Sequence, residues 1–80
     1  MTFEKIIALW PSTAEFARDI EVTVDLASKY QRGVRAIPDD RWLDVIEAAK
    51  KRGLSVTAEE LMAAARAFRR SAEARRRIAS

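Results

Sequence analysis

Apolar residues recur along the chain at spacings of three and four positions, the period of one face of an α-helix. Helix-ending signals at Trp10-Pro11, Gly33 and Gly53 divide this pattern into segments. With their caps included, the predicted helices span about residues 2–9, 12–20, 23–33, 38–52 and 57–77. The expected fold is therefore all-α, a small bundle of about five helices.

Polar residues at the start of each segment support these limits, because a side-chain oxygen can accept a hydrogen bond from a free N–H of the first turn. The predicted N-caps are Thr2, either Ser12 or Thr13, Thr23 and Thr57. Thr57 and Glu60 also have the spacing of a capping box. Pro38 suits the first turn of the fourth helix, where the helix dipole favours Asp39 and Asp40.

The stretch from Thr13 to Gly33 reads as two short helices joined by a tight turn. Its predicted packing positions are Phe16, Ala17 and Ile20 in the first helix, Val22 in the turn, and Leu26, Ala27 and Tyr30 in the second helix. At 100° per residue, Asp25, Ser28, Lys29 and Arg32 lie close together on the opposite side of the second helix. One face thus packs, and the other is free to contact a ligand.

This unit resembles the helix-turn-helix of the Cro and repressor proteins of phage and phage-derived elements. The family has a small residue within the first helix, here Ala17, and a turn four residues later, here Glu21 and Val22. Glu21 departs from the family, which most often has glycine there because the backbone tends towards positive φ. Ala27 also stands where a branched aliphatic residue is commoner.

The resemblance covers roughly residues 3 to 65, through Ile37-Pro38 and Arg41-Trp42. Accordingly, residues 1–65 are predicted to form a repressor-like helix-turn-helix domain, and residues 66–80 a basic helical extension. The chain has 15 basic and 12 acidic residues, a net charge of +3. Residues 1–65 hold nine basic and eleven acidic groups, net −2, whereas residues 66–80 hold six arginines and one acid, net +5. The extension either clamps a DNA backbone or serves as a solubilising helix end.

Composition excludes several function classes. Without cysteine there is no disulfide or thiolate metal site, and the chain also lacks histidine. The short apolar runs predict neither a signal peptide nor a membrane span, and hence a cytoplasmic protein. A cation site could be imagined at Asp39, Asp40 and Asp44. However, the first two lie at a helix start, where the helix dipole favours acidic residues, and no glycine-containing Asp loop is present. With no phosphate-binding loop and no nucleophile placed against a base, we expect no enzyme activity, cofactor or metal.

In the resembled family the second helix enters the major groove. The matching base-reading positions are Thr23, Val24, Asp25, Ser28, Lys29 and Arg32, and the candidates for DNA-backbone contacts are Thr13, Gln31, Arg35 and Arg41. Lys29 and Arg32 can donate to guanine, Asp25 can accept from cytosine, and Val24 can meet a thymine methyl group. Two alternatives without a ligand stay open: Asp25 offsets the helix dipole, and Lys29 and Arg32 form a solvated face. Tyr30 and Trp10 are expected in the core.

The resemblance implies a sequence-specific regulator of transcription that binds double-stranded DNA as a homodimer, with the dimer contact from Trp42 onward. The alternative is a small protein-interaction module, an antitoxin or adaptor, that binds a protein partner through the last helix.

Overall fold

The computed structural model describes the backbone of residues 1–79 and the side chains of residues 1–76. Its elements are α1 (Phe3–Ile7), α2 (Thr13–Asp19), α3 (Val24–Gln31), the 3₁₀ turn η1 (Asp39–Arg41), α4 (Trp42–Lys51) and α5 (Ala58–Ala79). Over the described range the fold is all-helical with five α-helices, which confirms the predicted fold class. Ser80, the last residue of the predicted extension, lies outside the described residues.

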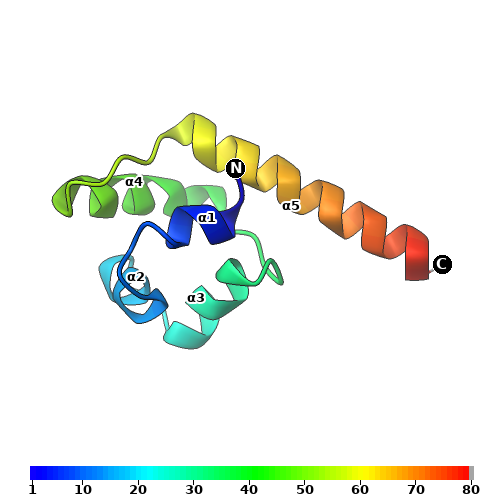
Figure 1. The fold of residues 1–80 in the computed structure, drawn as a ribbon, viewed down its shortest axis with the longest axis horizontal. Coiled ribbons are helices and arrows are strands. Elements are labelled where there is room, and N and C mark those ends of the chain that lie inside the picture. Colours follow the sequence, from blue (N-terminus) through cyan, green and yellow to red (C-terminus); the bar gives the residue numbers. More distant parts are fainter. Residues whose placement is uncertain (80) are drawn as a thin grey trace.

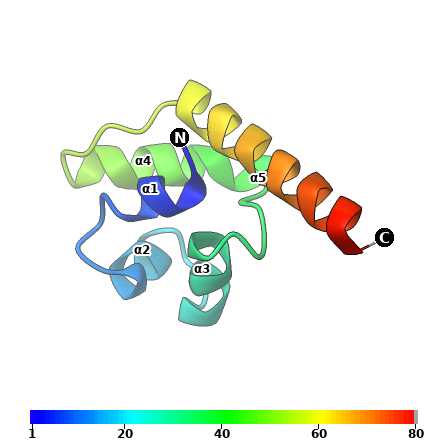
Figure 2. The ribbon, with the colours of Figure 1, turned by 45° about the vertical axis from the view of Figure 1, so that its right-hand side comes forward.

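The helices form two groups, with α1 between them (Figure 1). Helices α2 and α3 lie on one side of α1, and α4 and α5 lie on the other. The same arrangement is seen after a rotation of 45° about the vertical axis (Figure 2). In this view the C-terminal part of α5 extends beyond the rest of the molecule. The long dimension of the chain, 43 Å against 25 and 20 Å, reflects this projection.

Every predicted N-cap pair is present. The accepting side chains are Thr2, Ser12, Thr23 and Thr57, each 3.1 to 3.2 Å from the backbone N–H three residues later. Ser12, not Thr13, therefore caps α2. The capping box is complete, because the Thr57 N–H donates to Glu60 Oε1 at 3.0 Å.

Three predicted limits differ from the structure. Helix α1 ends at Ile7, not near residue 9, since the N–H groups of Leu9 and Trp10 bond three residues back in tight turns. Pro38 has extended backbone (ψ 153°) and precedes η1, so it is not in a first helical turn. The buried Ile37 holds this connector through its carbonyl, which accepts the Trp42 Nε1–H at 3.0 Å. Helix α5 continues to Ala79, past the predicted end.

The core is apolar and joins all five helices. Its largest fully buried side chains are Phe16, Ile6, Ile7, Ile20, Ile37, Leu61 and Val45. Trp10 and Tyr30 are each only 4% exposed, as predicted. Phe68 of α5 packs on Phe3 of α1, with ring centroids 6.4 Å apart, so α5 is one continuous helix that contacts the domain on both sides of residue 65. No helix within residues 1–79 combines the length and the apolar character needed to cross a membrane.

Candidate nucleic-acid interface

The turn between α2 and α3 has the backbone conformation that the resemblance anticipates. Glu21 has φ of +58°, the left-handed region that L-residues other than glycine rarely adopt. It closes a Schellman motif, in which the Val22 N–H donates to the Ala17 carbonyl at 3.0 Å and the Glu21 N–H to the Arg18 carbonyl at 3.3 Å. The same motif ends α3 at Gly33 and α4 at Gly53, both with φ of +75°. The turn therefore uses helix-ending geometry with glutamate in the glycine position.

Both helices of the α2–α3 unit bury a small residue. The two helices pack directly on each other, and Ala17 and Ala27 are 1% and 0% exposed. Because an alanine side chain reaches little beyond Cβ, two alanines allow the helices to approach closely. Ala27 is thus a full member of the core although it lacks a branched side chain. This packing fixes the direction in which α3 presents its other face.

That other face carries the predicted base-reading residues. Thr23, Val24, Asp25 and Arg32 are exposed, and Ser28 and Lys29 are half-buried. On the opposite side of α3, Ala27 and Tyr30 are buried and Leu26 is half-buried. The Val24 side chain is 54% exposed. All six predicted positions therefore lie in α3 or directly at its ends, and each is at least partly exposed.

Two polar contacts organise this surface. The Lys29 ammonium lies 3.3 Å from the Asp25 carboxylate one turn earlier. Arg32 Nε donates to the Ser28 carbonyl at 3.4 Å. An exposed ion pair at this spacing stabilises a helix by only about 0.2–0.5 kcal/mol. A ligand that offers better partners to Asp25 and Lys29 can therefore separate them.

The predicted backbone-contact residues have varied surroundings. The Thr13 hydroxyl donates to Gln31 Oε1 at 2.6 Å, and both side chains are half-buried. Thr13 is predicted to offer a phosphate its backbone N–H and its hydroxyl; of these, the hydroxyl proton is used within the protein, in a bond from the start of α2 to the end of α3. That bond leaves the Gln31 NH₂ group as the available donor. Arg35 is exposed after α3, and Arg41 lies 3.6 Å from the Asp44 carboxylate.

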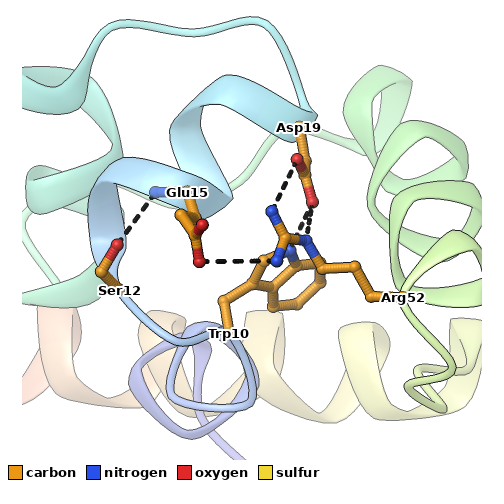
Figure 3. Close-up of polar contacts among 5 residues, drawn as sticks. All are labelled: Trp10, Ser12, Glu15, Asp19 and Arg52. Carbon is orange, nitrogen blue, oxygen red and sulfur yellow. Dashed lines mark hydrogen bonds and ion pairs between the residues drawn. The ribbon is translucent and has the colours of Figure 1, made fainter.

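A polar cluster that the sequence did not reveal connects α2 with Trp10 and with the end of α4 (Figure 3). The Asp19 carboxylate accepts from Trp10 Nε1–H at 2.9 Å and from the Arg52 guanidinium, whose Nη2 lies 3.2 Å from Oδ1. Arg52 Nη1 also lies 3.4 Å from the Glu15 carboxylate. These contacts join the end of α4 to both ends of α2. Since Asp19 and Arg52 are 33 positions apart, no local pattern pairs them.

Charge and hydrogen bonding within this cluster shift two pKa values. The Arg52 hydrogen bond is the main cause that lowers the pKa of Asp19, with a smaller contribution from the Trp10 indole, while partial burial opposes the shift. The Asp19 hydrogen bond in turn raises the pKa of Arg52. Both groups are therefore held in their charged forms.

Two grooves of opposite charge lie beside the α2–α3 unit. One, of about 320 Å³, is bounded by α1, the end of α3 and α5; Phe3, Tyr30 and Phe68 contribute its apolar lining. Lys5, Arg32 and Arg75 line the same groove, with Glu4 as its acidic member.

The other groove, of about 200 Å³, lies where the end of α2 meets α4. Its charged lining residues are Asp19, Glu21, Asp44, Glu47 and Lys51. Within residues 1–79, no cluster of three or more acidic side chains is arranged to hold a metal ion. The lining of this groove is thus mainly acidic, whereas basic side chains outnumber acidic ones in the first groove.

The chain matches no known protein family, no curated protein and no solved structure.

Proposed function

We propose that this protein is a sequence-specific regulator of transcription that inserts α3 into the major groove of double-stranded DNA. The proposal rests on the way α3 is packed against the rest of the domain. The helix is packed through Ala27 and Tyr30, it follows a left-handed turn at Glu21, and it directs its polar face outwards. The B-DNA major groove, about 12 Å wide, admits a helix presented in this way.

The chemistry of the exposed face suits base edges. Arg32 and Lys29 supply donors for the O6 and N7 acceptors of guanine, and Val24 supplies an apolar contact for a thymine methyl group. Asp25 can accept from cytosine N4, once its ion pair with Lys29 is exchanged for base contacts. Thr23 already accepts the Leu26 N–H through its hydroxyl oxygen, and that hydroxyl retains a proton to donate.

One helix of eight residues reads only a few base pairs, so the working form that we propose is a two-fold homodimer. Its half-sites would be centred about 10 base pairs apart, one turn of the duplex. Such a regulator acts in the cytoplasm of a bacterial or phage-infected cell, without a cofactor or metal and without enzyme activity.

Selection from randomised duplexes at roughly physiological salt, followed by sequencing of the retained DNA, tests this proposal. We expect enrichment of an inverted repeat with half-sites about 10 base pairs apart. A variant with Lys29→Ala and Arg32→Ala should lose the enrichment while its circular dichroism and melting temperature stay unchanged. Arg18→Ala removes an exposed basic side chain of α2 that lies outside the predicted base-reading, backbone-contact and dimer-contact residues, and this variant should retain the enrichment. The proposal fails if the wild type enriches no sequence, or if the two variants lose binding equally.

The alternative, a protein-interaction module, is favoured by one feature, the projection of α5 beyond the other helices (Figure 2). A projecting helix offers surface to a protein partner. In that case the Lys29 and Arg32 substitutions would leave the partner interaction unchanged, and substitutions in α5 would remove it.

A further inference from the structure

The basic groove brings together residues that are far apart in the sequence. Arg32 stands at the C-cap of α3, and Arg75 lies 43 positions later in α5, yet both line the groove of about 320 Å³. Lys5 of α1 lines it as well. Arg32 also belongs to the proposed base-reading face, so the groove begins where that face ends. The groove therefore connects the proposed base-reading residues of α3 with the basic C-terminal part of α5.

Helical phase explains why Arg75 points to this groove. Phe68 packs on Phe3, which fixes the side of α5 that faces the domain. Arg75 follows Phe68 by seven residues, which returns it to nearly the same side of the helix. Arg66 precedes Arg75 by nine residues, a rotation of about 900°, so it lies on the opposite side. The two arginines are both exposed and differ mainly in the direction they face.

The C-terminal part of α5 is strongly basic. From residue 66 to residue 76 it has five arginines and a single acid, Glu73. Among residues 1–76, none of these arginines lies within ion-pair distance of a carboxylate. At a rise of about 1.5 Å per residue this segment is about 16 Å long, enough to pass several phosphates of one strand.

From these observations we infer that α5 contacts the DNA backbone, with Arg75 binding phosphates that flank the base pairs read by α3. The inference rests on the proposed function. The occupant is the sugar-phosphate backbone because the domain-facing side of α5 beyond Phe68 offers Ser71, Ala72 and Arg75, which give little apolar area for a protein helix. The inference also agrees with the charge of the acidic groove between α2 and α4, because that groove repels a polyanion.

Salt dependence of binding measures such contacts. Each phosphate neutralised by a protein steepens the fall of log Kobs with log salt by about 0.9. We would titrate a mixed-sequence duplex of about 30 base pairs, and the selected duplex, with the full-length wild type and with the single variants Arg75→Ala and Arg66→Ala. Arg75→Ala should reduce the slope by about 0.9 on both duplexes. Arg66→Ala, with the same charge change on the far side of α5, should leave the slope nearly unchanged.

The outcomes separate the inference from its basis. Equal slopes for the two variants, with sequence-specific binding by the wild type retained, would overturn the α5 contact and leave the proposed function standing. If the wild type binds neither duplex, both are wrong. A slope loss in Arg75→Ala alone, with the preference for the selected duplex unchanged, supports a backbone contact that carries no sequence information.

Discussion

Replacing Glu21 with glycine should stabilise the protein. Glu21 is exposed, and its φ of +58° places an L-residue in the left-handed region at the turn between α2 and α3. The carboxylate makes no hydrogen bond or ion pair with any side chain among residues 1–76. Glycine removes the Cβ that is strained there, and the Schellman hydrogen bonds of the Glu21 and Val22 N–H groups can remain unchanged.

The expected gain is the difference of two effects. A left-handed conformation costs an L-residue roughly 1–2 kcal/mol. Glycine also increases the conformational entropy of the unfolded chain, which lowers stability by about 0.4–1 kcal/mol. The net increase in the free energy of unfolding is then about 0.5–1 kcal/mol. For a chain of this length, 1 kcal/mol raises the melting temperature by about 4–8 °C.

Glu21→Gln is the matched control, because it removes the charge from the acidic groove and retains Cβ. Urea and thermal unfolding, followed by circular dichroism, would compare the wild type and the two variants. The glycine variant should be more stable than the glutamine variant by about 0.5–1 kcal/mol. If glycine and glutamine are equally stable, or glycine is the less stable, the assignment of backbone strain to this turn is wrong.

Two further substitutions test the contacts that α2 makes with the rest of the domain. Asp19→Asn should destabilise the protein at neutral pH. The pKa of Asp19 is lower in the folded state than in the unfolded state. The Asp19 carboxylate therefore stabilises the fold fully above its unfolded-state pKa, and this stabilisation is lost as the pH falls through its folded-state pKa. The difference in melting temperature between wild type and variant should therefore stay constant from about pH 5 to 7 and shrink below about pH 4, and a difference independent of pH would contradict the role of the Arg52 contact. Ala17→Leu should destabilise by about 1–3 kcal/mol in urea unfolding, since it adds three carbons at a position only 1% exposed; an unchanged midpoint would show that α2 and α3 are not closely packed there.

Most of the local structure follows from short stretches of sequence. Thr2, Thr23 and Thr57 cap the helices as predicted because each cap bond joins residues only three positions apart. Gly33 and Gly53 end helices for an equally local reason, the ease with which glycine adopts positive φ. The helical period of the apolar residues was also sufficient to place Trp10 and Tyr30 in the core.

The positions on α3 were predictable for the same reason, since helical phase alone separates its packed side from its exposed side. Their polar contacts were only partly predictable. The pair Asp25 and Lys29 has the i, i+4 spacing of a helical ion pair. The bond from Thr13 to Gln31 spans two helices, and it changed the availability of a predicted phosphate donor.

The amino-acid sequence by itself thus determined the helices, their caps and the face that each helix buries, because these depend on residues within about one turn of each other. Only the tertiary structure decided which distant groups meet. The contact of Asp19 with Arg52, and the shared groove of Arg32 and Arg75, depend on the angles at which helices cross. Those angles result from the packing of the whole core, to which small side chains such as Ala17 and Ala27 contribute by permitting close approach.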